Sequence, residues 1–367
     1  MIFNPQPIRC PVKTLLKTIL AAILIAAFLS VPAAMGETLR LLTWKGYAPK
    51  NLVDKFEKET GIEMKITFTN NEEMIAKLRA TRGGGFDLAQ PSQDRIAGPQ
   101  KAFKIYGPID LSQVKTAQFI PSMLEATKRN TTVDGKVYGL PHVWGTSGMI
   151  VNTKHAADAV DYLDLCDPRY KGRVSYRVKR PTLVGFAWSM GFDPFAALAD
   201  RTEYKNMMEA VGKKLIECKP MVKTYWSNGD ALLSLIRSEE VHVAMAWDGG
   251  GWKAGKDNPD VKFIAPRSGA LGWVDTFALP SKSKNTSGAY KWINFMMRPE
   301  NAAEYTNQEN YATAAVGVDS MIGDAFKKNF SASFPPHAID NIKWYPPVDT
   351  WAEEIEGNVL EKLKAAR

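Results

Sequence analysis

The stretch Leu39–Phe68, LRLLTWKGYAPKNLVDKFEKETGIEMKITF, carries the clearest structural pattern in the chain. It begins with a mostly apolar run, Leu39–Thr43, that has the length and composition of a buried strand. Pro49 suits the start of a helix and Gly61 suits a helix end, so a helix is expected between them. Ile62–Phe68 then alternates between apolar and polar residues like a second strand. Strand–helix–strand units of this kind build α/β domains.

Two aromatic residues, Trp44 and Tyr47, follow the first of these strands, with Lys45 and Gly46 between them. In open α/β sheets, ligands bind in the crevice outside the carboxyl ends of the strands. We therefore expect Trp44 and Tyr47 to lie on a binding surface.

The first 36 residues have the pattern of an export signal and not of a folded segment. Their apolar run, Ile19–Leu29, is too short to span a bilayer and follows three basic residues (Arg9, Lys13 and Lys17). The small residues of Ala34-Met35-Gly36 predict cleavage before Glu37. An uncleaved anchor is the alternative. We expect a mature protein exported to the periplasm.

The composition indicates a globular protein and argues against a nucleic-acid partner. The 367 residues are 45% hydrophobic and 23% charged, and their number is enough for two domains. Signal cleavage would lower the formal net charge from +8 to +5, leaving 44 Lys and Arg against 39 Asp and Glu. These charges are scattered, without an arginine-rich run or a zinc spacing. Cys166 and Cys218 of the mature chain are compatible with a disulfide or with two buried thiols.

Strands and helices are predicted to alternate along the rest of the chain, which favours an α/β fold. Helices are expected over Asn70–Ala80, Leu183–Met190, Glu203–Ile216, Asp230–Ile236, Ser287–Met297 and Trp351–Ala365. Strands are expected over Phe86–Ala89, Arg173–Tyr176, Val241–Trp247, Val261–Ala265 and Trp273–Leu279. Lys136–Asn152 is predicted to form two extended pieces, broken by Pro141 and Gly145, that cross between two lobes.

The motifs of common enzymes and cofactor sites are absent from the sequence. There is no GxSxG elbow, P-loop or dinucleotide fingerprint. The four histidines are isolated and lack metal-ligand spacing (His142, His155, His242 and His337). We therefore predict a protein that is not an enzyme and has neither a metal nor another cofactor.

Aromatic and acidic residues at strand ends provide the clearest functional signal. Aromatic faces attract cations, and carboxylates add directional hydrogen bonds, so the two together suit a small organic amine. Trp44, Tyr47, Trp247 and Trp273 fall at strand ends or beside glycine, and Tyr311 follows in a loop. The polar residues in similar places are Ser92, Asp94, Asp248 and Asp275. The alternative for the tryptophans is an ordinary place in the core.

Seven stretches in a characteristic order resemble the periplasmic solute-binding proteins of ABC importers, specifically the spermidine/putrescine-binding family. They are LLTWKGYAPKNLVDKFEKETGIEM, AKLRATRGGGFDLAQPS, GLPHVWGTSGMIVNT, LCDPRYKGRV, VAMAWDGG, GWVDTFALPSKSKN and GAYKWINFMMRPENA. Each is weak alone, but in this order and spacing they are specific, and the resemblance covers nearly all of the mature chain.

The resemblance implies a type II periplasmic binding protein fold, with two α/β lobes joined by a hinge and the ligand cleft between them. We expect lobe one to comprise 37–142 plus 271–315, and lobe two 143–270 plus 316–367. It also implies a monomer that closes on a small-molecule solute and delivers it to an ABC permease in the inner membrane. A non-transport sensory receptor would have the same fold.

The resemblance further implies a ligand site in which aromatic residues enclose a methylene chain and carboxylates hold ammonium groups. Positions that match such contacts are Trp44, Tyr47, Ser92, Trp247, Trp273, Asp275 and Tyr311. Strand-end placement adds Asp248 to this set of predicted ligand-binding residues.

Three departures from the family pattern bear on the charge of the ligand. Lys45-Gly46 replaces a hydroxyl residue and an acid, and Asp94 replaces a tyrosine of some members. Arg177-Val178-Lys179-Arg180-Pro181 replaces a segment with acidic residues that hold an amine. One hypothesis is a polyamine ligand, with these charges facing solvent. The other is a ligand with one ammonium and one anionic end, such as an amino-acid-like or phosphonate-bearing amine. Asp275 and Asp94 would then hold the ammonium, and Lys45, Arg177 or Arg180 the anion.

Overall fold

The first sheet forms around β1 (Thr38–Thr43), which pairs in parallel with β2 (Glu63–Phe68) and β3 (Leu88–Ala89) in the order β2-β1-β3. The computed structural model describes Met1 and residues 37–366, and Thr38–Arg367 is one compact unit. The predicted signal peptide therefore lies almost wholly outside the described residues. Within the described part, every helix is too short or too polar to cross a membrane.

The helices beside this sheet begin and end as their sequences predict. Between β1 and β2 runs α2 (Lys50–Thr60), which buries Leu52, Val53 and Phe56 and ends at Gly61 in the left-handed conformation with φ 71°. Glycine adopts this conformation without steric cost. The next helix is α3 (Asn71–Ala80), and the side chain of Asn70 caps it by accepting a hydrogen bond from the Glu73 N–H at 3.1 Å.

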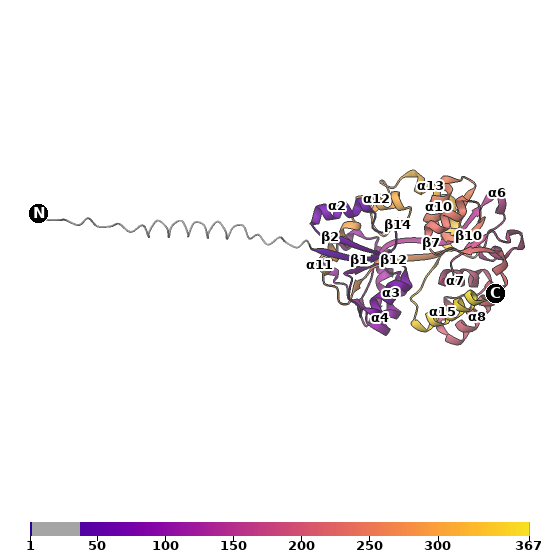
Figure 1. The fold of residues 1–367 in the computed structure, drawn as a ribbon, viewed down its shortest axis with the longest axis horizontal. Helices are drawn as coiled ribbons and strands as arrows, with labels where there is room; N and C mark the ends of the chain where they lie inside the picture. The colour runs from indigo at the N-terminus through magenta and orange to yellow at the C-terminus, as the bar shows by residue number, and fades with distance from the viewer. Residues whose placement is uncertain (2–36, 367) are drawn as a thin grey trace. The chain divides into compact units, whose positions relative to one another are not determined.

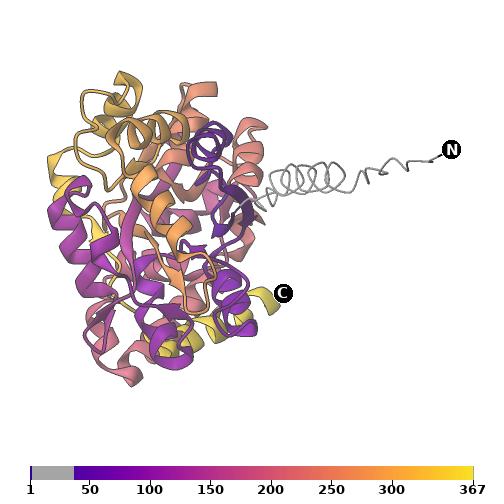
Figure 2. The same ribbon diagram turned by 90° about the vertical axis from the view of Figure 1, so that its left-hand side faces the viewer.

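The first lobe is the group of elements around this sheet, and it includes segments from the last third of the chain. It contains α4 (Ala97–Phe103), α5 (Pro121–Asn130), α11 (Thr286–Met296), α12 (Pro299–Glu309) and the paired strands β4 (Tyr106–Gly107) and β13 (Leu279–Pro280). Phe56 of α2 meets Trp292 of α11 edge-to-face at 5.0 Å. Figure 2 shows that the chain returns to the first lobe, because orange segments from the last third of the sequence lie among indigo and purple ones there.

Two long antiparallel strands connect the first lobe with the second sheet. They are β7 (Leu140–Asn152) and β12 (Leu271–Phe277), which lie side by side across the middle of Figure 1. The prediction of two extended pieces was wrong, because β7 is continuous through Pro141 and Gly145. Opposite Pro141 the register shifts between Asp275 and Thr276, and such a bulge accommodates a proline. The missing side chain of Gly145 leaves room for the Trp273 ring, since a Cβ there would lie 2.7 Å from that ring.

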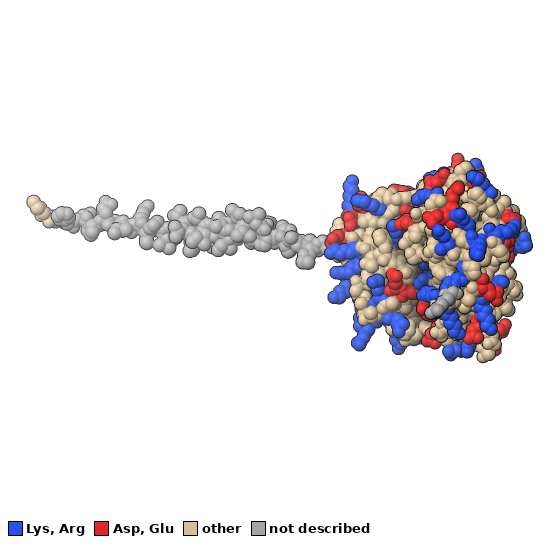
Figure 3. All heavy atoms as spheres, turned by 45° about the vertical axis from the view of Figure 1, so that its right-hand side comes forward, with Lys and Arg blue, Asp and Glu red and all other residues tan. Residues whose placement is uncertain are grey.

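The second lobe is built on β8, β9, β10, β11 and β15 of this sheet, whose order is β15-β12-β7-β10-β8-β9, with β11 and β14 also paired to β7. Their bounds are β8 (Val174–Tyr176), β9 (Val222–Tyr225), β10 (Val243–Trp247), β11 (Val261–Ile264), β14 (Ala312–Thr313) and β15 (Lys343–Trp344). The helices of this region are α6 (Thr153–Ala156), α7 (Arg180–Ser189), α8 (Arg201–Glu217), α9 (Gly229–Arg237), α10 (Asp248–Asp257), α13 (Asp324–Ser333), α14 (Pro336–Asp340) and α15 (Thr350–Ala365). The C-terminal helix α15 packs on α8. On the face drawn in Figure 3, acidic and basic side chains are interspersed.

Several helices were not predicted from the sequence, and α10 and α12 are two of them. The run Gly249-Gly250-Gly251 lies inside α10, where Gly249 and Gly251 allow close packing. A Cβ on Gly251 would lie 2.7 Å from Phe263 Cβ, and one on Gly249 would lie 2.7 Å from the Tyr311 ring. Pro299 does not only close the preceding helix, because it occupies the first turn of α12.

Cys166 and Cys218 form a disulfide, which decides between the two alternatives left open by the sequence. Their Cα atoms are 4.7 Å apart, and the bond closes a loop with a sequence separation of 52 residues. It ties the short 3₁₀ turn Tyr162–Cys166 to the end of α8.

We expect the double variant C166S/C218S to unfold with a free energy about 2–4 kcal/mol below that of the wild type, because the open loop gains conformational entropy in the unfolded chain. Denaturation with guanidinium chloride measures this difference. Wild-type protein treated with a reductant is the control and should match the variant. A loss below about 1 kcal/mol would show that the cross-link contributes little. Neither cysteine is a predicted ligand contact, so ligand affinity should not change.

Candidate functional site

Asp275 lies at the centre of the candidate site, on β12 and opposite the loop that follows β3. Its side chain accepts hydrogen bonds from the Tyr47 hydroxyl at 2.6 Å and from the Ser92 hydroxyl at 2.5 Å. The residue is 4% exposed. Burial raises the pKa of Asp275 to about 7, although both hydrogen bonds act to lower it. A cation placed beside this carboxylate would favour its ionised form.

Aromatic rings from three separate segments line this carboxyl group. The ring centre of Tyr47 lies 6.5 Å from that of Trp44 and 6.5 Å from that of Tyr311. The ring of Tyr311 in turn meets Trp273 edge-to-face at 5.6 Å. Trp44 is oriented by its indole N–H, which donates to the Gln90 carbonyl at 2.9 Å. The fold thus brings together these four predicted aromatic residues with Asp275 and Ser92.

Asp248 lies next to this aromatic group but is already fully hydrogen-bonded. As the first residue of α10, it accepts from the Thr146 N–H at 2.7 Å, the Thr146 hydroxyl at 3.0 Å and the Gly249 N–H at 2.7 Å. Burial raises the pKa of Asp248 to about 7, against the effect of these donors. Both Asp248 and the Trp273 ring approach Gly145. This carboxylate therefore holds β7 and α10 together beside the site.

A second wall is formed by Trp247, the last residue of β10. Its ring meets Trp226 edge-to-face at 5.1 Å, and the Arg177 guanidinium lies 4.9 Å from the centre of Trp247 and 5.2 Å from that of Trp226. These three residues line a small pocket with Ser147, Pro181, Thr182, Met245 and Ala246. Trp226 was missed from the sequence because it lies between β9 and α9, outside any predicted strand end.

A buried ion cluster joins the two lobes, and it changes the roles predicted for Asp94 and Arg180. Arg180 contacts Asp94 at 2.6 Å and Glu356 at 3.1 Å, and all three side chains are buried. Asp94 is therefore not a free carboxylate for an ammonium group. Arg180 faces neither solvent nor an open anion site. Glu356 was missed because nothing distinguishes it from the other acidic residues of α15.

The two remaining predicted cations are paired at the edge between the lobes. Lys45 is exposed and forms an ion pair with Asp230 of α9, so its charge already has an anionic partner. Lys179 contacts Glu72 of α3 at 3.0 Å. Both pairs link a first-lobe residue with a second-lobe residue.

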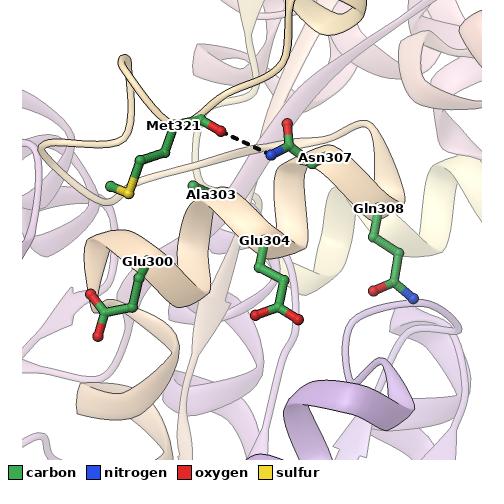
Figure 4. Close-up of a pocket in the computed structure, with 6 residues that line it drawn as sticks. All are labelled: Glu300, Ala303, Glu304, Asn307, Gln308 and Met321. Atoms are coloured by element: carbon green, nitrogen blue, oxygen red, sulfur yellow. Dashed lines mark hydrogen bonds between the residues drawn. The ribbon is translucent and has the colours of Figure 1, made fainter.

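A separate open hollow of about 500 Å³ lies on the outer side of α12. Figure 4 shows Glu300 and Glu304 along the helix, with Asn307 donating a hydrogen bond to the Met321 carbonyl at 2.9 Å. Ala303 and Gln308 complete the lining. None of the predicted ligand residues contributes to it.

Comparison with known proteins agrees with this fold and arrangement. The family model described as "Bacterial extracellular solute-binding protein" matches residues 51–332. The chain is 28% identical to the spermidine/putrescine-binding periplasmic protein of Escherichia coli (strain K12), covering 90% of this chain and 92% of that protein. It is 27% identical to the spermidine/putrescine-binding periplasmic protein 1 of Haemophilus influenzae, covering 91% of each.

A solved structure described as a putative spermidine/putrescine ABC transporter from Listeria monocytogenes superimposes with a TM-score of 0.80 at 26% identity. The match covers 90% of this chain and 100% of the Listeria chain. The two-lobed α/β fold of type II periplasmic binding proteins, predicted from the sequence, is thus confirmed. The chain belongs to the family of bacterial extracellular solute-binding proteins.

Proposed function

We propose that this extracellular solute-binding protein captures a small organic amine in the cleft between its lobes and delivers it to an ABC permease. The observation that carries the proposal is the buried carboxyl group of Asp275, held by Tyr47 and Ser92 among aromatic rings. A carboxylate supplies the negative charge that binds an ammonium group. Aromatic faces attract the positive charge that the ammonium group shares with its neighbouring methylene groups. The relatives named for spermidine and putrescine support this ligand class.

We also propose where the protein acts, which residues form each lobe and which residues contact the ligand. The protein acts as a periplasmic monomer without catalysing a reaction or binding nucleic acid. Lobe one comprises 37–142 plus 271–315 and lobe two comprises 143–270 plus 316–367. We assign direct ligand contact to Trp44, Tyr47, Ser92, Trp247, Trp273, Asp275 and Tyr311.

Capture follows from the position of the site between the lobes. The first lobe supplies Trp44, Tyr47 and Ser92, whereas Trp247 belongs to the second lobe. A ligand that contacts both walls binds the closed arrangement more tightly than the open one and shifts the population towards it. Ion pairs between the lobes, such as Lys45–Asp230 and Lys179–Glu72, then form at the edge of the closed cleft.

Calorimetric titration at pH 7.5 tests the amine requirement. The amine-bearing probes are butane-1,4-diamine, spermidine, 4-aminobutanoate and 3-aminopropylphosphonate, and the amine-free controls are butanoate and propylphosphonate. We expect at least one amine-bearing compound to bind with a Kd of about 10 µM or lower, which corresponds to roughly 7 kcal/mol. The amine-free controls should not bind. Failure of every amine, or equal binding of an amine-free control, would refute the proposal.

A further inference from the structure

Arg177 differs from the other cations near the cleft, because its side chain forms no ion pair within the described part of the chain, and Glu72, which acts on its charge, is itself paired with Lys179 and Arg95. Lys179 is paired with Glu72, and Arg180 with Asp94 and Glu356. By contrast, the Arg177 side chain makes no hydrogen bond or ion pair with any described residue, and its Nε is buried without an acceptor. Burial lowers the pKa of Arg177, although the Glu72 carboxylate acts to raise it.

The surroundings of Arg177 leave its hydrogen-bond donors available to a ligand. The guanidinium group lies within cation–π distance of Trp226 and Trp247, and these contacts use none of its N–H groups. Thr182 and Pro181 from the first turn of α7 line the same pocket. The N-terminus of this helix adds positive potential there. Both features favour an anion and oppose a second ammonium group.

The spacing along β7 relates this pocket to the carboxyl group of Asp275. Asp275 pairs with Val143 and Trp247 pairs with Ser147, so the two ends of the site are four residues apart on one strand. Four residues of extended chain span about 13 Å. The side chains of Asp275 and Arg177 shorten this span from both ends, so the length between the two groups suits a linear ligand of a few carbon atoms.

We propose that Arg177 binds an anionic group of the ligand, so that the transported solute is a short zwitterion with an ammonium group at Asp275 and a carboxylate or phosphonate at Arg177. This assignment rests on the proposed function, because it adds an anion-binding position to the same amine-binding site. A guanidinium fork matches either oxyanion with two parallel hydrogen bonds. A polyamine would instead place a second cation beside an unpaired arginine.

A matched pair of ligands tests the assignment on the wild-type protein. Butane-1,4-diamine and 4-aminobutanoate have the same number of carbon atoms and differ only at one end. We expect 4-aminobutanoate or 3-aminopropylphosphonate to bind at least about 10-fold more tightly than the diamine, and their relative affinities distinguish carboxylate from phosphonate. Tighter binding of the diamine would overturn the zwitterion assignment while leaving the amine site intact. If no amine binds, the proposed function itself fails.

Substitutions at Arg177 separate ligand binding from packing against the tryptophans. Arg177→Met should weaken binding of the preferred zwitterion about 10–100-fold and leave the diamine unchanged or tighter. Arg177→Lys keeps the charge without the fork and should give an intermediate loss. The control is Arg173→Met, at an exposed arginine whose side chain donates a hydrogen bond to the Glu239 carbonyl. Circular dichroism verifies the fold of each variant. Unchanged zwitterion affinity in both Arg177 variants would show that Arg177 only packs, and would overturn the assignment.

Discussion

Replacing Arg180 with Met will lower the free energy of unfolding by about 3–5 kcal/mol, because it removes one partner of a buried ion cluster. Asp94 and Glu356 would keep their carboxylates in the protein interior without the guanidinium group that they contact at 2.6 and 3.1 Å. Methionine fills a similar volume, so the loss reflects charge more than packing. Guanidinium chloride unfolding, followed by tryptophan fluorescence, measures the effect.

Two further variants show whether charge is the cause. Arg180→Met combined with Asp94→Asn and Glu356→Gln should recover much of the stability, since no unpaired charge remains buried. Arg237→Met breaks an exposed ion pair with Asp257 and should cost less than about 1 kcal/mol. If the Arg180→Met loss is as small as that of this control, the cluster contributes little to the fold.

The ion cluster also illustrates what the sequence could not predict. Arg180 lies 86 residues from Asp94 and at a still greater separation from Glu356, and no local pattern links them. Local signals were more reliable. Asn70 caps α3 and Gly61 ends α2 because each depends on residues within one helical turn.

Strand-end reasoning predicted aromatic residues that the fold brings close together, but it could not assign every charge. Trp44, Tyr47, Trp273 and Tyr311 surround Asp275 because the carboxyl end of β1 and the crossing strand β12 meet at one place. The charge of Lys45 is neutralised by a partner from the other lobe, which only the three-dimensional fold reveals. Arg177 became informative for the opposite reason, because its Nε is buried without an acceptor and its side chain forms no ion pair with a described residue.

Asp275 should make ligand affinity depend on pH near neutrality. Burial raises the pKa of Asp275 to about 7 in the free protein, so most of this carboxyl group is protonated at pH 5.5. An ammonium group requires the ionised form, and binding must then release a proton. We expect the affinity for the tighter of 4-aminobutanoate and butane-1,4-diamine to fall about 30-fold between pH 8 and pH 5.5. Both probes keep their charges over this range.

The contribution of Asp275 to the stability of the free protein changes with pH in the opposite direction to the ligand affinity. A carboxyl pKa raised by folding means that the native state binds more protons than the unfolded chain between the two pKa values. The contribution of Asp275 is therefore fully present below about pH 4 and is lost as the pH rises through about 7. His142, in contact with Tyr47, does not account for either trend, because burial lowers its pKa to about 3. Asp248, whose pKa burial also raises to about 7, adds to the stability trend with the same sign.

Asp275→Asn should abolish the pH dependence of binding and weaken binding at pH 8 by at least about 100-fold, since a charge-assisted contact is lost in a buried site. Titrations at pH 5.5, 6.5, 7.5 and 8 measure both effects, and buffers with different ionisation enthalpies report the released proton. Asp230→Asn is the matched control, because this carboxylate is exposed at the edge between the lobes and should leave the pH slope intact. A flat affinity profile of the wild type, or a slope that persists in Asp275→Asn, would assign the ammonium contact to another group.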